Sequence, residues 1–314
     1  MASSRDYLKR LEALNGGPLR HQGEAQPDVE EIRRRMEQKR AEKQRPPEPE
    51  PIHYRRNLPH TAEKTLPAST AGPAVKLEDG APGKEVIVGA CGCAYRIEAT
   101  LREIEGAENL LSETFQEQFL DQRSHIQRYL TSIGLPAPFQ PEDILVFDIE
   151  TTGLGHSPLF LIGTLSWEDD DLVVRQYFAR SYAEEAAVTS LFIEEAREKR
   201  LLVSYNGKSF DLPYIRTRAA ACRLPFTLAP AHFDLLHTAR RICRGKLPNC
   251  QLQTLERHIC GRTRFGDIPG AEIPDAYHDY VRTGNARRIV QILKHNMLDL
   301  VTLAELMTRL PVGR

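Results

Sequence analysis

An apolar run that ends in two acidic residues, ILVFDIETTGL at 144–154, most constrains how this chain can fold. The run is typical of a buried strand, in which alternate residues share a face, so Asp148 and Glu150 are expected to point the same way. Two carboxylates brought together away from water repel each other, and a divalent cation relieves that repulsion. Mg²⁺ and Mn²⁺ prefer carboxylate oxygen, so the pattern favours a metal site. The alternative is a solvated strand end in which Thr-Thr-Gly forms a turn.

Composition narrows the class of protein. The chain has 314 residues, enough for one or two domains, with 42 Lys+Arg against 43 Asp+Glu. This near-zero balance excludes a polycation that holds nucleic acid by bulk charge. We find no signal-peptide pattern and no apolar run of bilayer length, and so expect no membrane association. The 6 cysteines lack the spacing of a disulfide scaffold, and a reducing, cytoplasmic location is expected.

Composition also divides the chain into three parts. Residues 1–82 are rich in charge and proline and poor in apolar periodicity, which predicts a largely disordered or linker region. The sequence does not identify a protein partner for this region. Residues 83–140 are expected to form a small ordered extension, and residues 141–314 the main domain.

The main domain alternates strand and helix patterns. Strand patterns cover 143–149, 159–167, 171–179, 201–205 and 232–235, and helix patterns cover 183–199, 212–223 and most of the C-terminal part. Three consecutive strands followed by strands that alternate with helices indicate an α/β fold. We expect a mixed sheet, with a three-stranded meander followed by parallel strands, flanked by helices.

Two later segments supply further acidic residues. Asp211 follows a strand pattern and precedes a helix pattern; taken alone, it could be a helix N-cap ahead of Pro213. His295 and Asp299 are four residues apart in a long helix pattern and therefore share one face. Taken alone, they could be an exposed polar pair. Together with Asp148 and Glu150, in this order on this fold, these residues are hard to obtain by accident.

This ordered set resembles the DEDD exonuclease superfamily of ribonuclease H-like folds, and most closely its YprB-type domain. The matching motifs are Asp148-x-Glu150, then Asn206 with Phe210-Asp211, then His295-x-x-x-Asp299. The stretch FDLPYI at 210–215 is also similar to the second exonuclease motif of B-family DNA polymerases. The stretches FDLLHTARR at 233–241, LQTLE at 252–256 and DIPGAEIP at 267–274 support the YprB-type assignment. The resemblance covers roughly residues 143–310 and leaves out the N-terminal region.

The resemblance implies a two-metal phosphodiesterase. Its carboxylates, Asp148, Glu150, Asp211 and Asp299, would hold two Mg²⁺ or Mn²⁺ ions about 3.5–4 Å apart, one activating a water and the other steadying the departing oxygen. It also implies substrate contacts to the terminal nucleotide from Thr151, Thr152 and Leu154, with Asn206 helping to place the substrate.

His295 departs from the family pattern. One branch of the superfamily places a histidine five residues before the final aspartate, and the other places a tyrosine four residues before it. A spacing of four puts His295 on the helical face of Asp299, where it is a candidate general base for the attacking water. The alternative is a helix-surface histidine with no role in the chemistry.

The charge of the main domain agrees with a nucleic-acid partner. Residues 200–264 carry 12 Lys+Arg and 3 Asp+Glu, and the cluster Arg240, Arg241, Arg244 and Lys246 could contact phosphates or form a solvated helix face. We expect a 3′–5′ exonuclease that acts on single-stranded nucleic acid or a 3′ end. A structure-specific endonuclease that uses the same site and a non-catalytic nucleic-acid-binding module are the alternatives. The sequence does not distinguish DNA from RNA.

Overall fold

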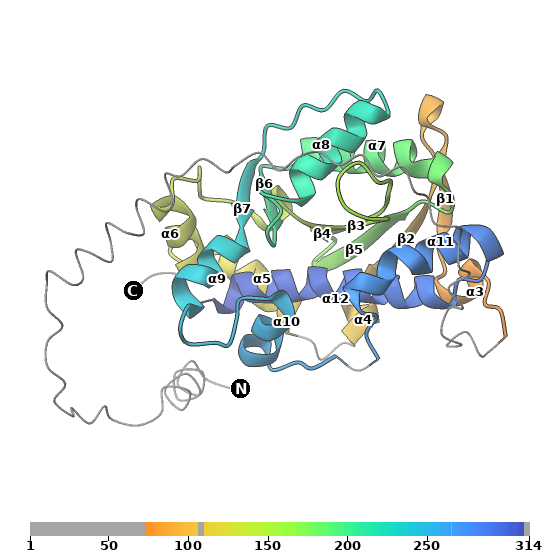
Figure 1. Ribbon diagram of the computed structural model, residues 1–314. Helices are drawn as coiled ribbons and strands as arrows, with labels where there is room; N and C mark the ends of the chain where they lie inside the picture. Colours follow the sequence, from red (N-terminus) through yellow and green to blue (C-terminus); the bar gives the residue numbers. More distant parts are fainter. Residues whose placement is uncertain (1–72, 106–109, 265, 311–314) are drawn as a thin grey trace, which may run out of the picture. The chain divides into compact units, whose positions relative to one another are not determined.

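The computed structural model describes residues 73–105, 110–264 and 266–310 (Figure 1). Of the region expected to be disordered or linker, only residues 73–82 fall within this part of the chain. The prediction for residues 1–72 lies outside the described residues.

One mixed sheet organises the described residues. Its strands are β1 (Lys84–Ile87), β2 (Cys93–Thr100), β3 (Ile144–Thr151), β4 (Leu159–Glu168), β5 (Asp171–Phe178), β6 (Leu201–Ser204) and β7 (Ala231–Asp234). Their order across the sheet is β1-β2-β5-β4-β3-β6-β7. Strands β3, β4 and β5 form the antiparallel meander, and β6 and β7 follow parallel to β3. The predicted ribonuclease H-like mixed sheet is therefore confirmed, and β1 and β2 extend it beyond β5.

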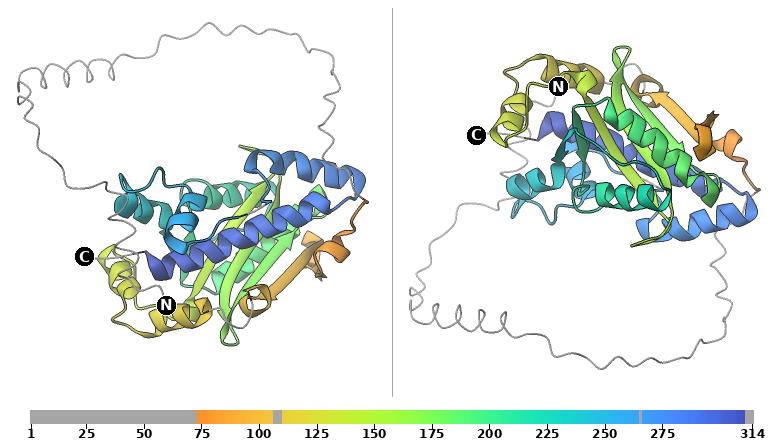
Figure 2. Two further views of the ribbon diagram at one scale, coloured as in Figure 1. Left: turned by 90° about the horizontal axis from the view of Figure 1, so that it is seen from below. Right: turned by 90° about the horizontal axis from the view of Figure 1, so that it is seen from above.

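Helices cover both faces of this sheet (Figures 1 and 2). They are α3 (Leu77–Gly80), α4 (Leu101–Glu105), α5 (Leu111–Leu120), α6 (His125–Ser132), α7 (Glu185–Arg197), α8 (Asp211–Ala221), α9 (Leu235–Cys243), α10 (Leu252–Leu255), α11 (Ile273–Thr283) and α12 (Arg287–Arg309). Helix α7 lies on one face, where the ring of Phe192 packs 5.3 Å from that of Phe147 on β3. Helix α12 lies on the opposite face, so β3 is covered from both sides.

Helix α12 carries the later acidic motif across the sheet. Ile289, Ile292, Leu293, Asn296 and Leu300 are all buried, and their spacing of three or four residues marks a single core-facing stripe. The helix packs against β3, β4 and β5, which brings residues in its middle under the end of β3. No helix within the described ranges, α12 included, is long and apolar enough to cross a membrane.

The ordered body begins before residue 83. Leu77 is only 3% exposed, and the Tyr95 hydroxyl on β2 donates a hydrogen bond to the Ala81 carbonyl at 3.0 Å. The Ala286 N–H at the start of α12 donates to the Val75 carbonyl at 2.8 Å. Residues 73–82 therefore pack on the main sheet, although the sequence places them in the linker region.

We predict that chains shortened to residues 73–314 and 83–314 differ in stability. The shorter chain loses the buried Leu77 and the partner of the Tyr95 hydroxyl, which should lower its free energy of unfolding by about 2–4 kcal/mol. Urea denaturation of the two chains measures the difference. Equal stabilities would show that residues 73–82 add nothing to the core.

Candidate active site

The first two carboxylates lie on the sheet face that α12 covers. Asp148 pairs across the sheet with Gly163, and Gly163 pairs with Gln176, whose side chain donates to the Leu293 carbonyl of α12 at 2.7 Å. Since residues alternate along a strand, Glu150 shares this face. Loss of hydration raises the pKa of both carboxyls well above the usual range, and the negative charges of other nearby acidic groups raise it further.

A buried amide pair fixes Asp148. The Asn296 side-chain amide on α12 donates to Asp148 Oδ2 at 2.9 Å, and Gln176 Nε2 donates to Asn296 Oδ1 at 2.9 Å. Asn296 is fully buried, and a Cβ at Gly163 would overlap its side chain. The glycine on β4 therefore lets the amide of α12 approach the carboxylate on β3.

Asp211 reaches the same place from another element. It is the first residue of α8, and Phe210 occupies the N-cap position, so Asp211 is not the helix N-cap considered from the sequence. Burial is the largest effect on the pKa of Asp211 and raises it to about 7. Hydrogen bonds from the backbone of Asp211 itself and of Ile149 act in the opposite direction and lower this pKa. The charges of Asp234 and Asp299 raise this pKa further.

The loop before Asp211 is held by a further acidic residue, Asp234. Asp234, at the end of β7, accepts the N–H of Asn206 at 2.8 Å and of Lys208 at 3.1 Å, and it caps α9 through the N–H of Leu236. Asn206 itself has φ of 67°, in the left-handed region that asparagine tolerates better than most residues. Its side chain is exposed, so it is free to meet a substrate at this edge.

The motif on α12 brings a histidine and an aspartate together, as the spacing predicts. His295 Nε2 lies 3.4 Å from Asp299 Oδ2, and His295 Nδ1 lies 2.8 Å from Asp267 Oδ1. The second oxygen of Asp299 accepts a hydrogen bond from Arg264 Nη2 at 2.6 Å. Burial raises the pKa of Asp299, whereas the charges of Arg264 and His295 lower it. His295 is thus an oriented, largely buried side chain rather than one on the open helix surface, and its role as a general base stays a prediction.

The segment after β3 forms a tied loop. The Thr151 hydroxyl donates to the Gly153 carbonyl at 2.8 Å, and the Thr152 hydroxyl donates to the Pro158 carbonyl at 3.0 Å. The Tyr214 hydroxyl of α8 bonds to the Gly153 carbonyl at 3.1 Å, which ties the loop to the helix of Asp211. Leu154 is 83% exposed at the tip of the loop. Of the predicted substrate contacts here, Leu154 therefore presents the most open surface.

Four carboxylates have the donor chemistry that a hard divalent cation prefers. Asp148, Glu150, Asp211 and Asp299 lie close enough to raise one another's pKa, which is the repulsion that a bound cation relieves. Across the described residues, no three His, Cys, Asp or Glu side chains already converge as a metal-holding group. Both oxygens of Asp299 face protein nitrogen atoms in this arrangement.

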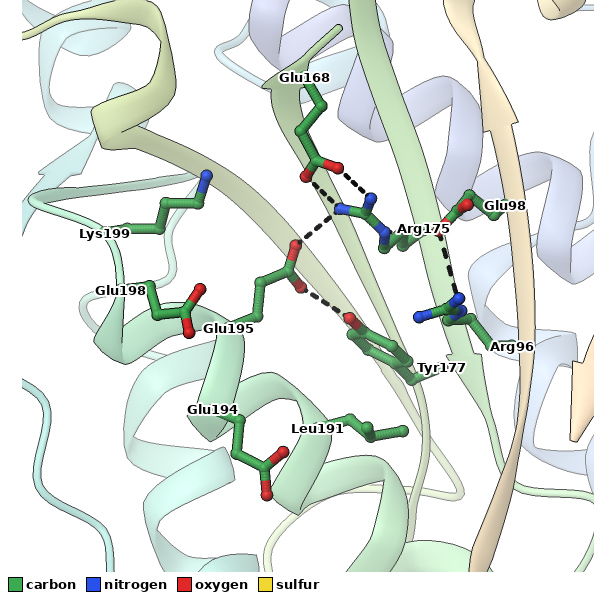
Figure 3. A pocket seen from close by; sticks show the side chains of 10 residues that line it. All are labelled: Arg96, Glu98, Glu168, Arg175, Tyr177, Leu191, Glu194, Glu195, Glu198 and Lys199. Carbon is green, nitrogen blue, oxygen red and sulfur yellow. Dashed lines mark hydrogen bonds and ion pairs between the residues drawn. The ribbon is translucent and has the colours of Figure 1, made fainter. Parts of the chain in front are cut away.

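A separate pocket of about 340 Å³ lies on the opposite face of the sheet, between β2, β5 and α7 (Figure 3). Arg175 pairs there with Glu168 and lies 3.5 Å from Glu195, and the Tyr177 hydroxyl donates to Glu195 at 3.0 Å. These charged groups satisfy one another. Charged side chains of this lining therefore pair with one another, and the carboxylates on the α12 face remain the candidate active site.

The fold agrees with the comparisons with known proteins. A profile of the RNase_H superfamily matches residues 145–311, and the chain belongs to that superfamily. The Bacillus subtilis protein YprB is 34% identical over 173 residues, which are 54% of this chain and 42% of that protein. The predicted resemblance to a YprB-type ribonuclease H-like protein is confirmed.

More distant relatives are DNA polymerases. The enzyme from Pyrococcus glycovorans is 26% identical over 55% of this chain and 26% of its own length, and that from Desulfurococcus sp. (strain Tok) is 25% identical over 44% and 22%. The solved family B DNA polymerase of Pyrobaculum calidifontis gives a TM-score of 0.44 at 20% identity, covering 54% of this chain and 24% of that chain. The chain thus spans less than half the length of these relatives. Its superfamily supports a nuclease-type function that contacts nucleic acid.

Three residues of the site were not anticipated from the sequence. Asn296 and Arg264 each contact a predicted metal ligand, and Asp267 contacts His295. Asp267 opens the DIPGAEIP stretch and Arg264 closes the basic 200–264 segment, but neither pattern indicates which side chain enters the site. Only the path of the chain between α10 and α11 brings them to α12.

We predict that Gly163→Ala destabilises the protein. The added methyl group overlaps the buried Asn296 side chain, and this kind of overpacking typically costs about 1–3 kcal/mol. Urea denaturation measures the loss. Gly270→Ala is the matched control because a Cβ there meets open space, and its stability should stay near that of the wild type. Equal stability of the two variants would contradict the proposed close approach.

We predict that the metal-free protein loses stability as the pH rises. Asp211 has a folded-state pKa of about 7, above the value of about 3.9 expected after unfolding. Its stabilising contribution is complete below about pH 4 and is lost as the pH rises through about 7.

Asp211→Asn removes this titration and should flatten the decline, which is at most about 1.4 kcal/mol per pH unit for one proton. Denaturation in EDTA between about pH 5 and about pH 8 measures the slope. Asp275→Asn, exposed on α11, should keep the wild-type slope. A wild-type slope in Asp211→Asn would contradict the assigned pKa.

Proposed function

We propose that this protein is a metal-dependent 3′–5′ exonuclease. The observation that carries the proposal is the meeting of acidic side chains from three distant segments of the chain. Asp148 and Glu150 come from β3, Asp211 from α8 and Asp299 from α12, and the charges of these groups act on one another. A folded protein gains no stability from such repulsion, so a function that needs it is the better explanation.

Each of these side chains has a place in the proposed chemistry. The four carboxylates would hold two Mg²⁺ or Mn²⁺ ions, which when bound activate water and stabilise the charge that develops on the phosphodiester. Asn296 keeps Asp148 in position through its buried hydrogen bond. When the Nδ1–H of His295 is donated to Asp267, Nε2 carries a lone pair that faces the Asp299 side. His295 is then able to accept a proton from the attacking water.

The surroundings of the site suit an unpaired nucleic-acid end. Leu154, in the loop that follows Glu150, presents an exposed apolar side chain that can pack against a terminal base, and the exposed Asn206 lies before Asp211. Arg240 and Arg244 are exposed at the end of α9, whose first turn is tied by Asp234 to the Asn206 loop. A strand that enters past α9 would therefore meet positive charge before it reaches the acidic site.

We predict that the protein shortens linear single strands stepwise from the 3′ end. Incubation of 5′-labelled and 3′-labelled DNA and RNA with Mg²⁺ or Mn²⁺ tests this. A ladder from the 5′-labelled strand, early release of the 3′ label and an intact circular single strand are expected, and EDTA should stop the reaction. Asp148→Asn, Glu150→Gln, Asp211→Asn and Asp299→Asn should reduce turnover to background, and His295→Ala should reduce it by roughly 10²–10⁴-fold with binding retained.

Asp275→Asn is the control, because it removes an equally acidic side chain from the exposed face of α11. It should turn over substrate like the wild type. Cleavage of the circular strand would replace the exonuclease with an endonuclease at the same site. Full activity of Asp148→Asn would remove the carboxylates from the chemistry altogether.

A further inference from the structure

Arg264 is a buried cation inside the candidate active site. Its side chain is 6% exposed and lies in the segment between α10 and α11. Nη2 bonds to Asp299 Oδ1 at 2.6 Å, Nε bonds to Glu256 Oε2 at 2.6 Å, and Nη1 lies 3.4 Å from Asp267 Oδ2. One guanidinium thus joins a proposed metal ligand to two acidic residues that are outside the set of four.

The ion pair distinguishes Asp299 from the other three carboxylates. The set consists of Asp148, Glu150, Asp211 and Asp299. Within residues 73–105, 110–264 and 266–310, the ion pair between an arginine or lysine and a member of this set is that of Arg264 with Asp299. Asp148 receives a neutral amide from Asn296, whereas burial and then the charges of Asp299, Asp211 and Asp267 raise the pKa of Glu150. The positive charge that offsets the four carboxylates therefore lies at Asp299.

The pair is strong because it is largely shielded from water. Burial acts to lower the pKa of the Arg264 guanidinium, but the charges of Asp299 and Glu256 outweigh that effect and raise it. The guanidinium therefore stays charged. A charge-assisted hydrogen bond of this kind contributes more than a neutral one, and the other oxygen of Asp299 faces His295 at 3.4 Å.

We propose that Arg264 competes with the divalent metal for Asp299 and so sets the metal affinity of the site. The inference rests on the proposed function, because it takes the four carboxylates as metal ligands. A cation that uses Asp299 Oδ1 must first displace Nη2, whereas Glu256 and Asp267 keep the guanidinium beside the site. Arg264 is then a positioning residue. It lowers the affinity of the site for the metal below the affinity that four unpaired carboxylates would have.

The test measures binding of Mn²⁺ alone, without substrate, to metal-stripped full-length protein. The electron paramagnetic resonance signal of free Mn²⁺ gives the dissociation constant. Arg264→Met removes the competing bond, and the dissociation constant should fall by about tenfold or more. If the single variant does not fold, the double variant Arg264→Met with Glu256→Gln takes its place, because it leaves no unpaired buried glutamate. The dissociation constant of the double variant should fall by the same factor.

Arg262→Gln separates competition from bulk charge. Arg262 is two residues away, approaches the same Glu256 at 3.9 Å and pairs with Glu305 at 2.6 Å. Removing it also deletes one positive charge, yet the dissociation constant should stay within about twofold of the wild type. An unchanged or higher constant in both Arg264 variants, or an equal fall in Arg262→Gln, overturns the proposal.

The same Mn²⁺ titration tests the proposed metal site separately from the role of Arg264. If the wild type binds Mn²⁺ and Asp148→Asn does not, the carboxylates are the metal site whatever Arg264 does. If the wild type does not bind but Arg264→Met binds, the competition is complete rather than partial, and the proposal is supported. If neither protein binds Mn²⁺, both the metal site and the role of Arg264 are wrong.

Discussion

Mutual repulsion among carboxylates with little access to water is the constraint around which this structure is organised. Asp148, Glu150, Asp211 and Asp299 come from one strand and two helices, and each raises the free energy of having the others ionised. Contacts from the surrounding protein oppose this repulsion, and two of them differ in strength. A neutral amide from Asn296 steadies Asp148, and a charged guanidinium from Arg264 binds Asp299. The metal-free site is therefore held together by packing around it rather than by its own interactions.

The sheet provides that packing. Strand β3 is covered by α7 on one face and α12 on the other, so its acidic end cannot turn away without disturbing both layers. Buried Asp234 fixes the loop before Asp211, and Tyr214 ties the loop after Glu150 to α8. These contacts are made by residues that do not touch a reacting group. These contacts position the end of β3 and the start of α8 so that the loops next to them lie together at the acidic site.

The sequence was sufficient for what depends on local periodicity. The apolar run before Asp148 predicts β3, the alternation predicts that Asp148 and Glu150 share a face, and the spacing of four predicts that His295 lies beside Asp299. It was insufficient for contacts set by the tertiary path, such as Arg264 with Asp299 and Gln176 with Asn296. The packing of residues 73–82 was missed for the same reason: their composition resembles a linker, and they are held by tertiary contacts such as those of Leu77, the Tyr95 hydroxyl and the Ala286 N–H.

The contact between Gly163 and Asn296 has a consequence for how this site can vary over evolution. The space for the asparagine exists only because β4 lacks a side chain at that point, and the asparagine in turn holds Asp148. Neither position can change alone without either a collision or an empty, poorly bonded site. Related sequences should therefore explore these two positions as a pair, with any side chain at 163 accompanied by a smaller residue at 296. Such covariation would link a residue with no chemical group of its own to the placement of the first acidic side chain.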